Sequence, residues 1–101
     1  MLATKEPIEF VWDKGNKDKN WLKHKVANQE CEEAFFDKKK KTFKDELHSK
    51  GEEKFRIIGK ARQGRCLFVV FTIRDSKIRI ISARDTNRKE VKLYEEETHI
   101  A

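Results

Sequence analysis

The sequence contains two kinds of side chain that can act together on a phosphate ester. His24 and His48 can accept or donate a proton near neutral pH, because imidazole titrates in that range. Arg79 and Arg84 carry planar guanidinium groups whose donors match the oxygens of a phosphate. Arg79 lies between two isoleucines of a predicted strand, so it points to the opposite face of the sheet from both, and Arg84 ends the same strand. These residues predict acid–base chemistry on a bound phosphate.

Each of these residues also has a structural interpretation. A histidine near the end of a helix, as His24 is, can neutralise the helix dipole, and His48 can be an ordinary loop residue. The two arginines can belong to a solvated strand face. Glu90 is interpreted mainly as a helix-capping residue and Tyr94 as a packing residue.

Other kinds of site find no support in the sequence. The histidines and cysteines show no spacing typical of zinc ligands: His24, Cys31, His48, Cys66 and His99. No glycine-rich phosphate loop and no Gly-x-Ser-x-Gly motif occurs. Two cysteines do not indicate a disulfide framework, and a reducing cytoplasm is the expected compartment. The sequence therefore predicts neither a metal ion nor another cofactor.

The composition favours a small domain with a polyanionic partner. The 101 residues include 24 Lys and Arg against 18 Asp and Glu, a formal net charge of +6. Such a surplus favours nucleic acid as the partner, although it also serves solubility. Hydrophobic residues make up 37%, so we expect a single domain over residues 1–101 with a small core and no large substrate pocket. No apolar run approaches the roughly 20 residues of a membrane span.

Alternating apolar residues predict the strands. A first strand is predicted over residues 8–12, where β-forming residues are enriched. Three segments separated by turn residues, 53–59, 65–73 and 77–83, predict an antiparallel three-stranded meander. The polar stretch before the meander leaves room for a short strand at 41–43.

Helical periodicity and capping residues predict three helices. A short helix is predicted over 17–26, and a second one has an inner face formed by Cys31, Ala34 and Phe35. Asn87 and Glu90 form a capping box that begins a C-terminal helix. The expected fold class is α+β, with an antiparallel sheet packed against two N-terminal helices and one C-terminal helix.

Several short blocks of residues occur in an order that matches a known family. In the first half these are Phe10-Val11-Trp12-Asp13, Lys17, Asn20, Lys23-His24, Val26, Glu30, Phe35 and Asp37. In the second half they are Asp45, His48-Ser49, Gly51-Glu52-Glu53, Phe55, Ile58-Gly59, Gly64-Arg65, Val69-Val70-Phe71-Thr72, the run from Ile78 to Arg84, Arg88, Glu90 and Tyr94. Over residues 8–96 the sequence resembles the BrnT family of type II toxins. The resemblance implies a RelE-like fold and ribonuclease activity.

The resemblance also implies roles for particular residues. Metal-independent cleavage of RNA needs a base for the 2′-hydroxyl, an acid for the departing 5′-oxygen and fixed cations at the phosphate. The expected catalytic residues are Arg79, Arg84, His24, His48 and Lys54. The expected RNA-binding residues are Lys23, Trp12 and Arg65. Trp12 could stack on a base, but core packing is the more common role for a strand tryptophan, and Trp21 is also expected in the core.

The partners implied by the resemblance are RNA as the substrate and a ribbon-helix-helix antitoxin of the BrnA kind. Antitoxin binding would hide the basic face of the toxin and prevent inhibition of translation and growth. The toxin–antitoxin pair would then bind operator DNA and repress its own synthesis. No membrane partner is expected.

Four positions depart from the family pattern. Lys54 replaces a usual arginine and loses its bidentate fork, and Lys25 replaces a glycine that would cap a helix in the left-handed conformation. Lys38 stands where a proline is common, and Asp85 stands where the family tends to be basic. Lys54 and Asp85 motivate a second hypothesis, a catalytically weak or inactive module that acts in antitoxin binding and DNA autoregulation. A third hypothesis is a general RNA-binding protein.

Overall fold

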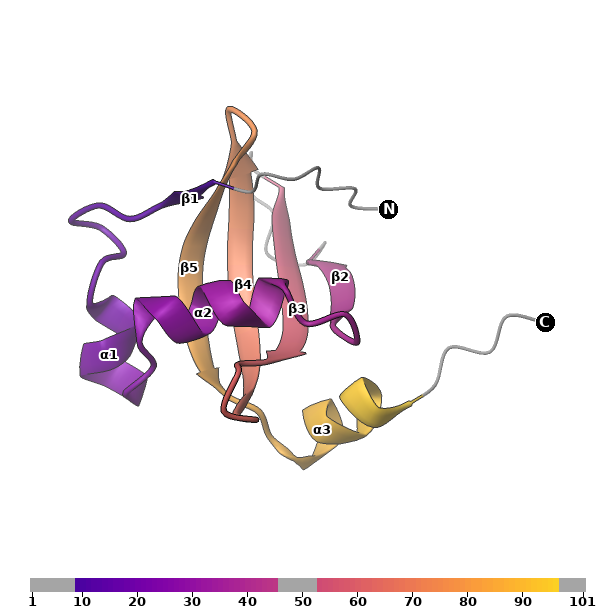
Figure 1. The fold of residues 1–101 in the computed structure, drawn as a ribbon. Helices are drawn as coiled ribbons and strands as arrows, with labels where there is room; N and C mark the ends of the chain where they lie inside the picture. The colour runs from indigo at the N-terminus through magenta and orange to yellow at the C-terminus, as the bar shows by residue number, and fades with distance from the viewer. Residues whose placement is uncertain (1–8, 46–52, 97–101) are drawn as a thin grey trace.

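The computed structural model describes residues 9–45 and 53–96 of the chain (Figure 1). These residues form an α+β fold, which confirms the expected fold class. The helices are α1 (Lys19–His24), α2 (Asn28–Phe35) and α3 (Arg88–Glu95). The strands are β1 (Phe10–Val11), β2 (Lys41–Asp45), β3 (Lys54–Lys60), β4 (Cys66–Arg74) and β5 (Lys77–Asp85). None of the helices described is long and apolar enough to cross a membrane.

The sheet is larger than the expected meander and is not purely antiparallel. Its strand order is β1-β5-β4-β3-β2, with antiparallel pairing from β2 through β5 and parallel pairing of β1 with β5. The expected antiparallel meander is present as β3, β4 and β5, but it lies within a five-stranded mixed sheet, so the expectation of an antiparallel RelE-like sheet does not match in detail. A parallel pair needs a long connection, and the whole chain between β1 and β5 supplies it.

One face of the sheet is covered by α2, which crosses in front of β3 and β4 (Figure 1). The predicted inner residues of this helix are all buried: Cys31, Ala34 and Phe35. The ring of Phe35 meets that of Phe71 in β4 edge to face, with 4.8 Å between centroids. Leu67, Val69 and Phe71 are fully buried on this side of β4, so Phe68, Val70 and Thr72 face the other side.

A bulge in β5 changes which of its side chains share a face. Phe71 of β4 pairs with Ile80, and its neighbour Val70 pairs with Ser82, so Ile81 is an extra residue without a partner opposite. Residues 79 and 84 are an odd number apart and would lie on opposite faces of a regular strand. Because of the bulge, Arg79 and Arg84 both lie on the face away from α2.

Two buried asparagines fix the outer edge of β5 where the short strand β1 has ended. Asn16 donates from its side chain to the carbonyls of Val11 and Ile80, at 2.8 and 3.0 Å. Asn20 of α1 accepts a hydrogen bond from the backbone N–H of Ala83 at 2.9 Å. These bonds satisfy backbone groups on both sides of the bulge, so they hold the strand that carries both arginines.

The exposure of Trp21 corrects one expectation. This tryptophan was expected in the core, but it is 49% exposed, because the six-residue helix α1 turns Asn20 toward the sheet instead. The helix ends at Lys25, whose φ of 56° is left-handed. Lys25 therefore adopts the left-handed cap conformation at the position where the family usually has glycine.

The turn between β4 and β5 offers a direct test of backbone strain. Asp75 and Ser76 both have positive φ, 51° and 64°, as the turn of a two-residue hairpin requires. Replacing Ser76 with glycine removes a Cβ from a left-handed position and is expected to raise the free energy of unfolding by about 0.5–1 kcal/mol. Urea denaturation would measure this change in the free energy of unfolding, with Ser82→Gly, inside β5, as the control. An unchanged or lower stability for Ser76→Gly would contradict this account.

Candidate functional site

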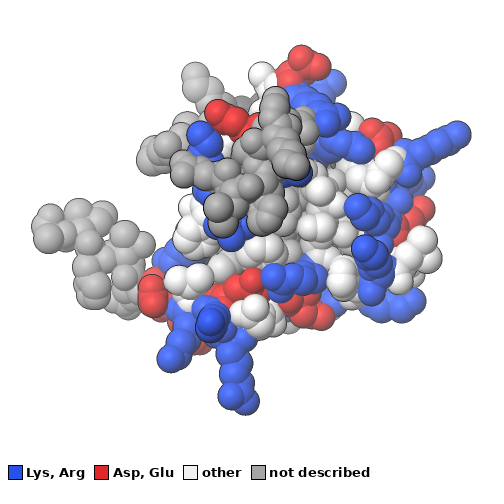
Figure 2. All heavy atoms as spheres, turned by 180° about the vertical axis from the view of Figure 1, so that it is seen from behind, with Lys and Arg blue, Asp and Glu red and all other residues white. Residues whose placement is uncertain are grey.

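The face of the sheet opposite α2 carries the candidate site, and we call it the open face. Its residues follow from the strand register, and three rows run across β3, β4 and β5: Lys54–Thr72–Arg79, Arg56–Val70–Ser82 and Ile58–Phe68–Arg84. Neighbouring strands lie about 4.8 Å apart, so the cations of β3 and β5 flank a middle strand that presents Thr72, Val70 and Phe68 on this face. Figure 2 shows the molecule from this side, with Lys and Arg around a paler patch.

Arg79 is held at one end of the open face by Asp13. Its Nη1 donates to Oδ2 of Asp13 at 2.7 Å, and its side chain is 19% exposed. The hydrogen bond from Arg79 lowers the pKa of Asp13. A Cβ on Gly15 would lie 2.7 Å from Nη2 of Arg79, so the glycine allows the guanidinium to approach the loop closely. A phosphate at this position would compete with Asp13 for the same donors.

Arg84 is held at the other end of the face by Glu90 of α3. Its Nη1 and Nη2 donate to the two carboxylate oxygens at 2.9 and 2.8 Å, and the guanidinium lies 4.3 Å from the ring centre of Phe68. Glu90 also accepts from the backbone N–H of Asn87, which confirms the predicted capping box. The carboxylate therefore occupies the bidentate position that a phosphate would take.

The titration of Glu90 gives a pH-dependent prediction. Burial raises the pKa of Glu90, but the hydrogen bonds from Arg84 and Asn87 outweigh it, so the pKa lies below its ordinary value of 4.5. A carboxyl with a lowered pKa stabilises the fold fully above pH 4.5, and this contribution is lost as the pH falls through the folded-state pKa.

Glu90→Gln is therefore expected to be less stable than the wild type at neutral pH, with a difference that shrinks below pH 4.5. Urea denaturation of both proteins, from neutral pH to below pH 4.5, measures this difference in the free energy of unfolding. Glu95→Gln, at an exposed position of the same helix, serves as the control. If the difference in the free energy of unfolding between Glu90→Gln and the wild type stayed constant with pH, the lowered pKa of Glu90 would be contradicted.

Arg56 is a cation of the open face that sequence reasoning missed. It lies between the rows of Lys54 and Ile58, near the ring of Phe43, whose centre is 5.9 Å from the guanidinium carbon. Its buried Nε has no hydrogen-bond partner among the described residues, and such a donor costs about 1–3 kcal/mol. The signal was present in the sequence, because a residue two positions after Lys54 shares its face of the strand.

Arg65 lies away from the open face and acts as a structural clamp. Its guanidinium donates to Asp85 at 2.7 and 3.1 Å and to Glu30 at 3.1 Å. It also donates to the backbone carbonyls of Lys25 and His24 at 2.8 and 3.2 Å. The clamp joins the end of α1, the start of α2 and the end of β5. Asp85, unusual for the family in sequence, is thus the partner of Arg65.

The remaining predicted residues are not brought together on the open face. Lys23 and His24 lie at the exposed end of α1, where the carbonyl of His24 meets Arg65. Trp12 packs against the core and donates from Nε1 to Glu32 at 2.6 Å, which matches its structural interpretation. His48 lies outside the described residues. Of the predicted residues that the structure describes, the open face therefore brings together Arg79, Arg84 and Lys54.

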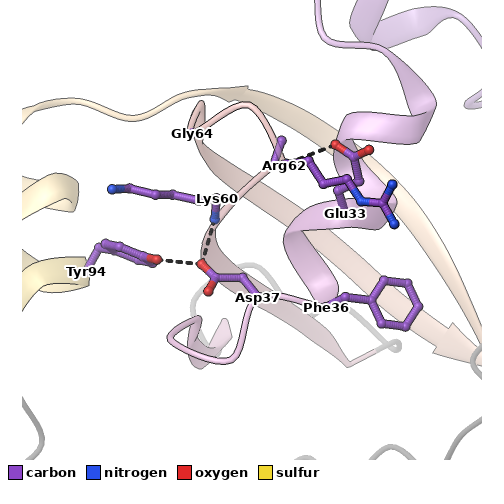
Figure 3. A pocket seen from close by; sticks show the side chains of 8 residues that line it. Glu33, Phe36, Asp37, Lys60, Arg62, Gly64 and Tyr94 are labelled. Atoms are coloured by element: carbon purple, nitrogen blue, oxygen red, sulfur yellow. Dashed lines mark hydrogen bonds between the residues drawn. The ribbon is translucent and has the colours of Figure 1, made fainter.

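A groove of about 450 Å³ lies on the helix side of the sheet, between α2, the β3–β4 hairpin and α3 (Figure 3). Tyr94 donates to Asp37 at 2.6 Å, and the backbone N–H of Lys60 donates to the same carboxylate oxygen at 2.8 Å. Burial and the hydrogen bond to Asp37 raise the pKa of Tyr94. These bonds anchor α3 to the body of the protein, so we assign the groove a structural role.

Among the described residues, no three His, Cys, Asp or Glu side chains are placed to hold a metal ion.

A comparison with protein-family models matches residues 12–90 to one family, which is described as the ribonuclease toxin BrnT of type II toxin-antitoxin systems. The match begins directly after β1 and ends in the first turn of α3, so it includes the strands β2, β3, β4 and β5. A search of curated proteins gave no match.

Proposed function

The chain belongs to the BrnT family of ribonuclease toxins of type II toxin-antitoxin systems, and we propose that it cleaves RNA on its open face. The observation that carries this proposal is the bulge in β5, which puts Arg79 and Arg84 on one face with Lys54 and Arg56. Cations fixed across a sheet can bind successive phosphates of a single strand and stabilise a negatively charged transition state.

The proposed reaction is a transfer within the RNA backbone. A base removes the proton of a 2′-hydroxyl, the 2′-oxygen attacks the adjacent phosphorus, and the bond to the 5′-oxygen breaks as an acid supplies its proton. Arg79 and Arg84, at opposite ends of the open face, would hold the oxygens of two phosphates of the same strand after exchanging their carboxylate partners for them. The products are a 2′,3′-cyclic phosphate and a 5′-hydroxyl.

We propose His48 for proton transfer in preference to His24. His24 lies on the helix side, and its carbonyl belongs to the Arg65 clamp. His48 stands in the sequence between Asp45 and Lys54, two residues that pair at the Arg79 end of the open face. Lys54 would add a positive charge to the same row. Lys23 remains a proposed RNA contact through its position at the exposed end of α1.

We propose that cleavage takes place in the cytoplasm, inhibits translation and growth, and is neutralised by a ribbon-helix-helix antitoxin of the BrnA kind. The net charge of +6 favours an antitoxin with acidic segments, whose association would be fast and sensitive to salt. Binding of operator DNA would then belong to the complex of the two proteins.

A second candidate function is a binding module without strong catalysis. It is favoured by the carboxylates of Asp13 and Glu90, which already occupy the donors of the two arginines. Such a module would bind antitoxin and take part in autoregulation but would leave RNA intact. A general RNA-binding protein, the third hypothesis, would bind RNA with strong salt dependence and without cleavage.

The experiment incubates the purified chain with a defined single-stranded RNA in the presence of EDTA. The proposal predicts fragments ending in 2′,3′-cyclic phosphate, and no cleavage where the 2′-hydroxyl is replaced by hydrogen. Intact RNA would overturn the nuclease proposal, and a salt-dependent complex without fragments would favour the third hypothesis.

A further inference from the structure

A small pocket lies on the open face beside Arg84, and we propose that it binds one guanine base of the RNA substrate. Its volume is about 230 Å³, and it is lined by Phe43, Arg56, Ile58, Phe68, Glu90 and Leu93. The inference rests on the proposed function, since it names the base that accompanies the phosphate held by Arg84.

The walls of the pocket suit a flat aromatic ring. Phe43, Ile58 and Phe68 come from three adjacent strands, and Leu93 of α3 closes the other side with 40% of its surface exposed. The volume lies below the roughly 300–1,000 Å³ typical of pockets for larger organic ligands. Single-stranded RNA is commonly recognised by unstacked bases that pack against aromatic side chains. The walls therefore favour a single base over a phosphate group.

The polar groups of the pocket favour guanine among the bases. Arg56 lines the pocket, so its guanidinium can donate hydrogen bonds to a base bound there. Guanine presents two adjacent acceptors, O6 and N7, which an arginine binds as a pair, whereas adenine replaces O6 with a donor. Glu90 lines the same pocket, and among the described residues its Oε2 accepts from Arg84 alone, which leaves a lone pair for a ring N–H.

The position of the pocket connects base recognition with phosphate binding. Phe68 lines the pocket and also lies under the guanidinium of Arg84, at 4.3 Å. Glu90 joins the two sites in the same way, because it lines the pocket and holds Arg84. A base in the pocket would thus place its own phosphate group near Arg84, so guanine would fix the register of the strand on the open face and with it the position of cleavage.

The test titrates the purified chain with guanosine, adenosine and uridine 3′-monophosphates and follows the backbone and arginine side-chain signals by NMR. We expect the guanosine nucleotide to bind about tenfold more tightly than the others and to shift the Nε signal of Arg56. Arg56→Lys, which keeps the charge, is expected to remove this preference. Arg62→Lys, at an exposed position beside the helix-side groove, is the matched control.

Two outcomes would overturn the inference: equal affinity for all three nucleotides, or shifts confined to residues outside the pocket. Cleavage of single-stranded RNA provides the second measurement, with guanine replaced by adenine at each position in turn. RNA cleavage without base preference would reject guanine binding in the pocket and leave the nuclease proposal standing. Selective binding of the guanosine nucleotide without RNA cleavage would support the pocket and reject the nuclease.

Discussion

Replacing both Arg79 and Arg84 with alanine is expected to lower the rate of RNA cleavage about 10³-fold. Each guanidinium would contribute charge-assisted hydrogen bonds to a phosphate of the bound strand, one of which is the phosphate on which negative charge develops. The two residues act on one reaction, so the double variant should lose less than the product of the single effects. Initial rates on a fluorescently labelled single-stranded RNA would measure the loss.

A matched control separates this effect from the loss of overall charge. Lys19→Ala Arg62→Ala also removes two positive charges, but from exposed positions in α1 and in the β3–β4 hairpin. This control is expected to retain cleavage within a few-fold of the wild type. The Arg79→Lys Arg84→Lys variant keeps the charge but loses the bidentate guanidinium groups. Its rate of RNA cleavage should fall between those of the alanine variant and the control. Equal losses in the alanine variant and the control would show that only net charge matters.

Arg65→Ala is expected to lower the free energy of unfolding by about 3 kcal/mol. The substitution leaves the carboxylates of Glu30 and Asp85 and the carbonyls of His24 and Lys25 without their shared donor. The hydrogen bonds from Arg65 also lower the pKa of Asp85. Urea denaturation at neutral pH would measure the change.

The control for Arg65 is Arg62→Ala in the same hairpin, whose side chain is exposed. Its expected effect is within about 0.5 kcal/mol, as for surface substitutions in general. If Arg65→Ala were as stable as this control, the clamp would not be a structural element. Arg65 would then be available for the RNA contact that the family resemblance implies.

Local sequence patterns predicted the elements that depend on one segment alone. The inner face of α2 followed from the spacing of Cys31, Ala34 and Phe35, because helical periodicity determines which residues share a side. The start of α3 followed from Asn87 and Glu90 for the same local reason. Parallel pairing of β1 with β5 depends on contacts between distant segments, so alternation within each strand carried no signal for it.

The arrangement of the candidate site depended on a feature that residue spacing does not contain. Regular alternation would have separated Arg79 from Arg84, and only the bulge at Ile81 brings them to one face. The ion pairs with Asp13 and Glu90 were also beyond local patterns, since Asp13 is far from Arg79 in sequence. Arg65 was expected to contact RNA, whereas its partners come from three separate elements that its position in the sequence does not reveal.

Expression of this chain alone in a bacterial host tests the central claim most directly. Growth and the integrity of total RNA would be followed after induction, beside the Arg79→Ala Arg84→Ala variant at equal protein level. The account predicts growth arrest with RNA fragmentation for the wild type, and normal growth with intact RNA for the variant. Normal growth with intact RNA in cells that contain the folded wild-type chain would contradict it and favour the binding module.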